Sequence, residues 1–132
     1  MNYNKLSIEE FEAILIKEFP EMYKNMNSDE YVICLAYGLE TPTGWNSLIY
    51  ILSKKIYKFC KDAKIDFPIV AQVKEKFGGL RFYLESSTCK EIDDFISEAE
   101  HISYYICYKC GMFYDITKEH NYLCEDCSKN RR

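Results

Sequence analysis

The sequence predicts an α+β protein in which about three helices pack on a small antiparallel β-hairpin, with a docked C-terminal zinc ribbon. Three observations lead to this prediction. Three segments carry apolar residues at helical spacing. One segment alternates apolar and polar residues around a glycine pair, which is typical of a hairpin. Residues 107–132 contain two Cys-x-x-Cys pairs.

The N-terminal part of the chain predicts one helix followed by less regular structure. Ser7 and Glu10 have the spacing of a capping box, which marks a helix start. Pro20 cannot continue a helix, so we expect this one to end just before it. Beyond it we expect a short helical piece over residues 22–26 and an irregular or extended stretch over residues 32–37.

Two further helices are predicted by apolar residues that recur on one face. The first covers residues 45–64, and the second runs from a capping box at Thr88 and Glu91 to Ile106. The opposite face of the 45–64 helix is basic and carries Lys54, Lys58 and Lys61.

Residues 69–85 predict the β-hairpin, with Gly78 and Gly79 as its two-residue turn. Glycine adopts the positive φ angles of such a turn without steric cost. In this register one face of the hairpin is apolar except for Glu75. The other face holds Gln72, Lys74, Lys76, Arg81, Tyr83 and Glu85.

The polar face of the predicted hairpin places Lys76 directly opposite Arg81, and Lys74 opposite Tyr83. Two opposed cations are unfavourable unless a negative group lies near them. Three interpretations remain open. In the first, the two cations extend into water or are neutralised by Glu85 or an acidic residue of the third helix. In the second, they bind an anion such as phosphate, nucleic acid or an acidic protein patch. In the third, a bulge at the glycines shifts the register. The candidate binding residues are therefore Lys74, Lys76, Arg81 and Tyr83, together with Lys54, Lys58 and Lys61.

The most specific motif is C-x2-C-x13-C-x2-C, formed by Cys107, Cys110, Cys124 and Cys127. Zinc prefers four soft ligands in a tetrahedron, and two Cys-x-x-Cys turns brought together by a hairpin supply them. One structural Zn²⁺ per chain is therefore the expected cofactor. The alternative is a redox dithiol, which normally uses one Cys-x-x-Cys pair beside a βαβ unit.

The expected zinc site is structural because four thiolates leave no open position for water or substrate. We expect Gly111 to form the sharp turn after the second cysteine, and ribbon strands over residues 112–116 and 120–123. His120 is expected to be an exposed loop residue and not a ligand.

Two parts are expected along the chain. Residues 1–106 form the α+β domain, and residues 107–132 form the zinc-ribbon module with a short basic tail. The third helix runs into Cys107 without a linker, which predicts that the module is docked on the domain.

Composition narrows the classes of function. Hydrophobic residues make up 48% of the chain, which supports a core and argues against disorder. No apolar run approaches the roughly 18 residues that span a bilayer, and the acidic N-terminus is unlike a signal peptide. We therefore expect a cytoplasmic protein without a membrane partner. The net charge of −4 argues against unspecific DNA coating, although residues 41–85 carry eight basic and four acidic groups, net +4.

No catalytic constellation is recognisable in the sequence. It contains no glycine-rich phosphate loop and no nucleophile elbow. His101 falls on a polar helix face, and Cys89 lies beside Lys90 without an obvious base. Glu75 is better explained as a rim residue, or as the partner of a buried cation, than as a general base. We therefore expect that the protein is not an enzyme.

Four segments occur in one order: "GWNSLIYILSKKI", "VAQVKEKFGGLRFYLE", "IDDFISEAEHIS" and "CYKCG…LCEDC". In this order, over roughly residues 19–128, they resemble a family of small bacteriophage and prophage proteins without an established activity. The chain differs from the usual members in its longer N-terminal helix and in its tyrosine and lysine content. The residues that carry the resemblance are Gly44, Trp45, Lys74, Glu75, Lys76, Phe77, Gly78, Gly79, Arg81, Tyr83 and the four cysteines of the motif.

Two functional hypotheses follow. The resemblance implies a phage accessory protein in a bacterial host cytoplasm, where it would bind a host or phage protein, with inhibition of a defence complex as one form. Aromatic residues make up 16% of the chain, including 12 tyrosines, and this favours a recognition surface. The alternative is binding of nucleic acid or a nucleotide by the basic hairpin face and the lysines of the 45–64 helix, aided by the ribbon and the C-terminal "KNRR".

Overall fold

The computed structural model describes residues 2–26, 34–117 and 121–129. It confirms the α+β class, since three helices of 11, 18 and 14 residues accompany a two-stranded antiparallel sheet. In the parts of the chain that the structure describes, no helix is both long enough and apolar enough to cross a membrane.

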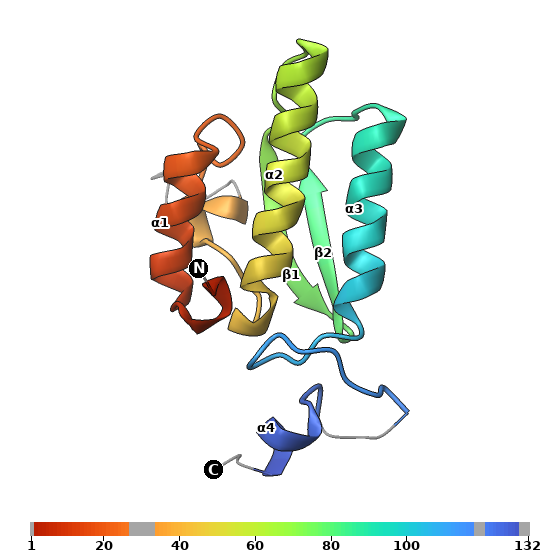
Figure 1. Cartoon of the computed structure of the whole chain (residues 1–132). Coiled ribbons are helices and arrows are strands. Elements are labelled where there is room, and N and C mark those ends of the chain that lie inside the picture. Colours follow the sequence, from red (N-terminus) through yellow and green to blue (C-terminus); the bar gives the residue numbers. More distant parts are fainter. Residues whose placement is uncertain (1, 27–33, 118–120, 130–132) are drawn as a thin grey trace.

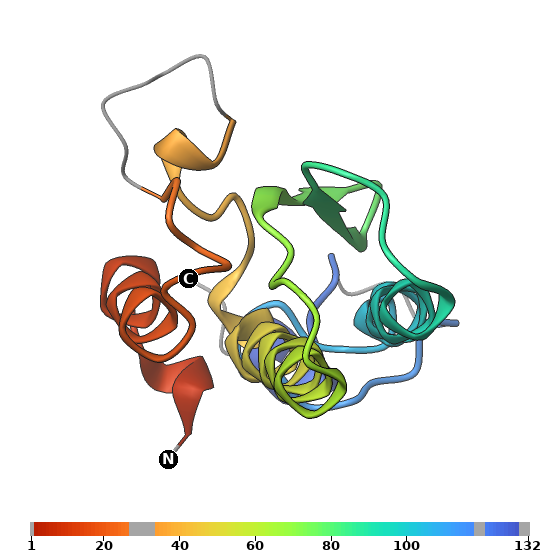
Figure 2. The same cartoon turned by 90° about the horizontal axis from the view of Figure 1, so that it is seen from above.

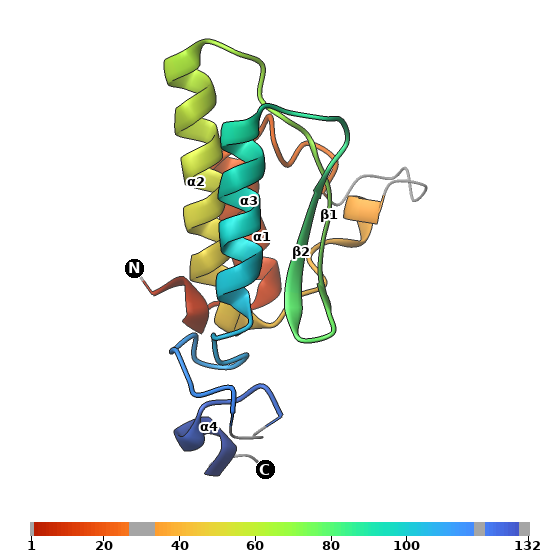
Figure 3. The ribbon, with the colours of Figure 1, turned by 90° about the vertical axis from the view of Figure 1, so that its right-hand side faces the viewer.

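The helices and the sheet form two layers. Helices α2 and α3 form one layer, the hairpin lies across them as the other, and α1 stands at the side of α2 (Figures 1 and 2). The C-terminal segment lies beyond one end of both layers, next to the hairpin turn (Figure 3). The elements are α1 (Ile8–Glu18), α2 (Asn46–Ala63), β1 (Val70–Lys76), β2 (Gly79–Leu84), α3 (Lys90–Ser103) and the short α4 (Glu125–Lys129).

Helix α1 begins at the predicted capping box. The Ser7 hydroxyl accepts the Glu10 N–H at 3.1 Å, and the Glu10 carboxylate accepts the Ser7 N–H at 3.0 Å. The helix ends before Pro20, and the predicted helical piece over residues 22–26 consists of hydrogen-bonded turns.

An irregular or extended stretch was predicted over residues 32–37. This prediction was wrong for residues 34–37, and residues 32 and 33 lie outside the described part. Cys34–Tyr37 form a 3₁₀ turn that buries Leu35 and Ala36. Gly38 ends this turn with a φ of +84°. Burial of two apolar side chains against the core explains why the chain turns here.

Helix α2 matches its prediction, but the predicted capping box of the third helix was wrong. Helix α3 begins at Lys90, and its N-cap is Cys89, which makes no side-chain capping bond. Because the helix starts one residue late for a box, the Thr88 hydroxyl instead donates to the Asp93 carboxylate at 2.9 Å. Helix α3 ends at Ser103, and the chain reaches Ile106 through hydrogen-bonded turns.

The core lies between the two layers and reaches to α1. Trp45 is fully buried just before α2, in a 3₁₀ turn that spans Thr43–Trp45. Other fully buried side chains are Phe11 and Leu15 of α1, Ile49 and Ile56 of α2, Val73 and Leu80 of the hairpin, and Met22 and Leu35 from the connecting chain.

The hairpin is present, but its turn lies one residue earlier than predicted. Phe77 and Gly78 form the turn, with φ angles of 55° and 87°, and Lys76 pairs with Gly79. Arg81 therefore lies opposite Lys74 and not opposite Lys76, and the predicted pairing of Lys74 with Tyr83 was also wrong. The paired strand residues keep their predicted faces, because a turn displaced by one residue shifts the pairing by two. Phe77, which was predicted on the apolar face, instead lies in the turn and is exposed. The irregularity in the pairing lies at Val70–Gln72, away from the glycines.

Contacts with α3 explain this register. The backbone N–H groups on the outer edge of β2 need partners, and α3 supplies them. Ser103 accepts the Leu80 N–H at 2.8 Å, and Glu100 accepts the Phe82 N–H at 2.9 Å. On the outer edge of β1, Glu40 makes two backbone hydrogen bonds of 3.0 and 2.9 Å. Both edges of the hairpin are thereby covered and its position is fixed.

Candidate metal centre and its junction with the core

The four cysteines of the C-x2-C-x13-C-x2-C motif come together in one cluster. The sulfur atoms of Cys107, Cys110, Cys124 and Cys127 all lie within 4.8 Å of one another. The distance between the Cys110 and Cys124 sulfurs is 3.7 Å, far longer than the roughly 2.05 Å of a disulfide bond. Cys107 is buried and the other three are half-buried. Four thiols in this arrangement could hold a metal ion.

Each Cys-x-x-Cys pair folds into a turn whose backbone points at sulfur. In the first turn the Lys109 N–H points to the Cys107 sulfur at 3.4 Å, and Gly111 forms the predicted sharp turn with a positive φ of 81°. In the second turn the Cys127 N–H points to the Cys124 sulfur at 3.5 Å, at the start of α4. Such N–H groups orient thiolate ligands and stabilise their negative charge.

These backbone groups also explain the ionisation of Cys107. Burial opposes its ionisation, but the backbone N–H groups of Cys110, Cys124 and Lys109 outweigh burial and lower the pKa of Cys107 to about 6. Burial and the neighbouring thiols raise the pKa of Cys127. One thiol in the cluster therefore ionises readily and disfavours ionisation of its neighbours, whereas a bound cation favours thiolates at all four positions.

The predicted strands of the ribbon were not found in the described residues. Where strands were expected over residues 112–116 and 120–123, the structure has a single bridge between Phe113 and Ile106. The chain after Gly111 thus folds back on the end of α3, with a backbone hydrogen bond from Cys107 to Met112 of 2.8 Å.

The second predicted strand is prevented by its own backbone. Asn121 and Tyr122 have positive φ angles of 54° and 65°, which are incompatible with a strand. His120 lies outside the described residues.

We call residues 107–117 and 121–129 the metal module. At Gly44 the backbone of the core lies directly against the backbone of this module. The Gly44 N–H donates to the Tyr108 carbonyl at 2.7 Å. A Cβ atom on Gly44 would overlap the carbonyl oxygens of Cys107 and Tyr108, so only glycine fits. Next to it the Trp45 ring meets the Tyr108 ring edge-on at 5.2 Å.

Asn4 forms a second contact between the metal module and the core. Its side-chain amide donates to the Cys110 carbonyl at 3.4 Å, and its oxygen accepts the Ser47 N–H at 2.8 Å. Asn4 also fills the space that a side chain at Gly111 would need. The N-terminus thereby connects the first cysteine turn to the start of α2.

The hairpin turn forms the third contact. The Tyr122 ring stacks on the Tyr108 ring at 4.9 Å and covers Gly78, where a Cβ atom would lie 2.7 Å from the Tyr122 ring. Glu75 accepts the Gly78 N–H at 2.8 Å. Burial, and then the nearby Glu75 carboxylate, raise the pKa of Tyr108. Glu75 thus acts as a half-buried residue that fixes the turn.

Three segments that are distant in the sequence therefore meet at one place. Tyr108 of the "CYKC" segment lies where this segment meets "GW" and the turn of "KEKFGG". Sequence reasoning singled out these segments but missed Asn4, Tyr108 and Tyr122. The tyrosine content was the available signal for the two rings, and no pattern marked Asn4.

The basic candidates on the hairpin lie on the face turned away from the helices. Lys74 is opposite Arg81, and its ammonium group lies 5.8 Å from the centre of the exposed Tyr83 ring. The Arg81 guanidinium donates to the Tyr104 hydroxyl at 3.1 Å. Lys76 is exposed beside the turn.

The basic candidates on α2 form a separate surface. Lys54, Lys58 and Lys61 are exposed and line a groove against the end of α1. Lys58 pairs with Asp62 at 3.0 Å, and the Lys61 ammonium lies 5.9 Å from the Tyr57 ring centre. Because α2 and the hairpin form different layers, these lysines do not extend the hairpin face (Figure 3).

Large exposed apolar side chains gather on the metal module and beside it. Met112 and Phe113 are 65% and 71% exposed, and Phe77 at the hairpin turn is 80% exposed. Ile116 and Tyr122 of the module are exposed as well.

Comparison with known protein families, curated proteins and solved structures finds no match to this chain.

Proposed function

We propose that this chain is a non-enzymatic, zinc-containing phage accessory protein that binds a host or phage protein in the bacterial cytoplasm. The gathering of exposed apolar side chains on the metal module is the observation that supports this proposal. Such side chains on a soluble protein are typical of protein-binding sites, and large ones often provide most of the binding energy.

The cysteine cluster fits zinc better than it fits magnesium or calcium. With zinc–sulfur distances of about 2.3 Å, the edge of a regular tetrahedron is about 3.8 Å. The 3.7 Å between the Cys110 and Cys124 sulfurs agrees with that edge. Four soft thiolates favour zinc over magnesium or calcium, which take oxygen ligands. All four coordination positions are then filled by the chain, so the role of the ion is structural.

The ion and the proposed binding surface belong to the same loop. Met112, Phe113 and Ile116 lie between the two cysteine pairs, which the ion would join. Bound zinc supplies free energy for folding in such small modules. Zinc would therefore hold these apolar side chains in position at the surface.

The experiment is purification of the tagged, metal-loaded chain from a bacterial host, followed by native mass spectrometry. We expect one zinc ion and one stoichiometric, identifiable protein that binds again after separate purification. A chain with Met112→Ser and Ile116→Ser should keep its zinc and melting temperature but lose this protein. The control carries Ile16→Ser and Ile65→Ser, which are exposed outside the module, and should bind as the wild type does. Absence of such a protein in several hosts would contradict the proposal.

Inhibition of a bacterial defence complex is the form of this function that we would test next. Expression of the chain in a host with such a system should raise the plating efficiency of a restricted phage. The Met112→Ser, Ile116→Ser variant should not raise it. If wild type and the variant raise the plating efficiency equally, the effect does not depend on the exposed apolar side chains of the module.

Nucleic-acid binding is the second candidate, supported by the pairing of Lys74 with Arg81 beside the exposed Tyr83 ring. Two adjacent cations and an aromatic ring can contact phosphates and stack on a base. Binding of single-stranded RNA or DNA should fall with salt, and Arg81→Ala and Lys74→Ala should each reduce the salt slope by about one. Lys58→Ala is the control because Lys58 lies in the other layer. Flat binding curves would remove this candidate.

A further inference from the structure

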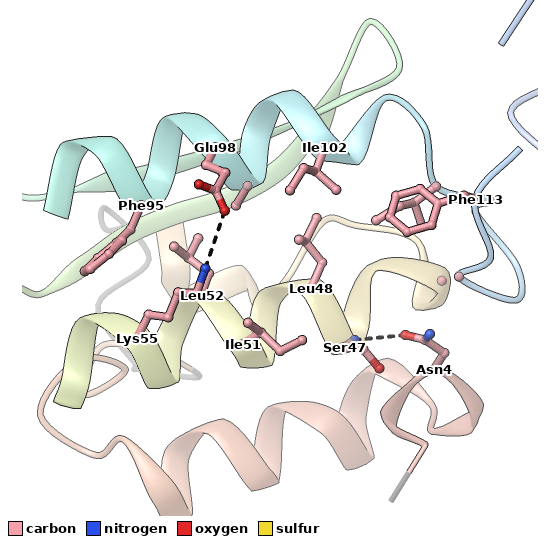
Figure 4. Close-up of a pocket in the computed structure, with 14 residues that line it drawn as sticks. Asn4, Ser47, Leu48, Ile51, Leu52, Lys55, Phe95, Glu98, Ile102 and Phe113 are labelled. Carbon is pink, nitrogen blue, oxygen red and sulfur yellow. Dashed lines mark hydrogen bonds and ion pairs between the residues drawn. The ribbon is translucent and has the colours of Figure 1, made fainter. Parts of the chain in front are cut away.

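An apolar groove runs between α2 and α3 on the side away from the hairpin (Figure 4). Its volume is about 290 Å³. Phe113 and Ile106 close the end nearest the metal module. The residues along the groove include Leu48 and Leu52 from α2 and Phe95, Ala99 and Ile102 from α3.

Each rim of the groove carries a charged side chain, and the α2 rim also carries an exposed apolar side chain. Ile51 projects from α2 beside the groove and is 52% exposed. Lys55 of α2 and Glu98 of α3 reach across the groove and pair at 3.5 Å. Both charged side chains are exposed, so their pairing contributes little to the stability of one chain.

We propose that a second copy of this chain covers the groove in a twofold dimer whose axis runs parallel to α2 and α3. These helices are antiparallel neighbours, as the chain direction in Figure 1 shows. Rotation by half a turn about such an axis places α2 of each copy against α3 of the other, again antiparallel. The two helix pairs then form a four-helix bundle, which is a common way to cover two apolar helix faces.

The charges on the two rims select a second copy as the occupant. A rotation about an axis parallel to the helices keeps every residue at its height. Since Lys55 and Glu98 lie at the same height in one chain, Lys55 of each copy would meet Glu98 of the other. The face is therefore complementary to itself, with a basic rim on α2 and an acidic rim on α3. A twofold interface requires this property, whereas an unrelated partner does not.

The size of the groove sets the expected strength. From Ser47 to Lys55 the groove follows nine residues of α2, and the eight steps between them span about 12 Å at 1.5 Å per residue. An interface of this length is small, so we expect a dissociation constant on the order of micromolar. Phe113 belongs to both surfaces, but Met112 and Ile116 do not line the groove, so changes at these two residues test the proposed partner without altering the groove.

The test is sedimentation equilibrium of the full, metal-loaded chain from low to high micromolar concentration. Wild type should change from monomer to dimer, and Ile51→Glu should weaken the dimer at least about tenfold because it places two carboxylates in the apolar interface. Ile65→Glu is the matched control, since Ile65 is similarly exposed but lies outside the groove. Circular dichroism checks that each variant is folded. A wild type that stays monomeric, or a dimer that Ile51→Glu leaves intact, would overturn the proposal.

Charge reversal tests the twofold arrangement itself. Lys55→Glu alone and Glu98→Lys alone each create two like-charge contacts and should weaken the dimer several-fold. An equal mixture of the two variants should recover wild-type association, because both contacts in the mixed dimer then join opposite charges. Pairing within one chain cannot be restored by mixing. A mixture no stronger than the separate variants would overturn the proposed arrangement.

Discussion

The core and the metal module are stabilised in different ways. The core buries Trp45 and large aliphatic side chains from all three long helices and from the hairpin. In the described part of the module, Cys107 is the one buried residue, while Met112 and Phe113 point outward. One region thus uses its apolar residues for its own interior, and the other presents them at the surface.

This difference implies that the metal module cannot fold by burial alone. Each large aliphatic side chain that is fully buried contributes about 1.5–3 kcal/mol to stability, and the module lacks such side chains. Its order must come from the four cysteines and from contacts with the core through Gly44, Asn4 and Tyr122.

The largest effect is expected from Cys124→Ser, which removes one of the four thiolates. Zinc binding to such sites contributes about 10–16 kcal/mol, so we expect zinc to fall from one ion per chain to nearly none after mild chelation. The helical signal should remain, because the core does not contain the cluster. Metal analysis and circular dichroism measure the two results.

The matched control for that change is Cys34→Ser, since Cys34 is an exposed thiol outside the cluster. It should keep one zinc ion. Retention of the ion by Cys124→Ser would show that the cluster is not the metal site.

The junction is tested by Gly44→Ala, with Gly79→Ala for comparison. The new methyl group at Gly44 meets backbone carbonyl groups, which cannot move without displacing the metal module. At Gly79 it meets the Tyr104 side chain, which can rotate. We expect a loss of about 2–4 kcal/mol for Gly44→Ala and about 1 kcal/mol for Gly79→Ala. Urea unfolding gives both values, and the reverse order would contradict the described junction.

A pH-dependent change is expected inside the core, where Glu12 is buried and accepts the Leu39 N–H at 2.8 Å. Burial raises the pKa of Glu12 above its ordinary value of 4.5, despite the hydrogen bond from Leu39, and the Glu9 charge adds to the rise. The folded state therefore binds this proton more tightly than the unfolded state does, so its contribution to stability is present at low pH and is lost as pH rises through the raised pKa.

Glu12→Gln removes this dependence and keeps an acceptor for Leu39. Wild type should gain stability relative to Glu12→Gln as pH falls from 7 toward 4.5, in thermal unfolding at several pH values. A relative gain in the opposite direction would contradict the assignment.

The smallest of these effects is expected at the start of α1. Ser7→Ala removes one side of the capping box and should cost about 1 kcal/mol. Ser86→Ala in the exposed loop before α3 should change stability by less. Because α1 belongs to the core, neither change should alter metal content. A shift in zinc affinity with Ser7→Ala would indicate stronger coupling of the two regions than we describe.

Local sequence signals predicted much of the fold because local physics determines those parts. The Ser7 and Glu10 box, the stop at Pro20 and the apolar face of α2 all depend on residues within a few turns. The cysteine spacing likewise predicted which four side chains would meet.

The error in the hairpin register lies where distant contacts decide, whereas the expected capping box at Thr88 missed the local start of α3 by one residue. The hairpin turn moved to Phe77 because Ser103 and Glu100 of α3 hold β2, and Tyr104 fills the space above Gly79. The expected ribbon strands failed because the residues after Gly111 pair with the turns that follow α3, and because Asn121 and Tyr122 have positive φ angles. The α3 residues that hydrogen-bond to the hairpin are 18 and 23 positions away in the sequence, so periodicity and turn chemistry could not reveal them.

The most direct test of this account is amide hydrogen exchange of the chain with zinc and after its removal. We expect that amides of the metal module, such as Tyr108 and Gly111, lose their protection without zinc, while those of α2 and the hairpin keep most of theirs. Full protection of the metal module without zinc would contradict a metal-dependent fold. Equal loss of protection in both regions would contradict the independence of the core.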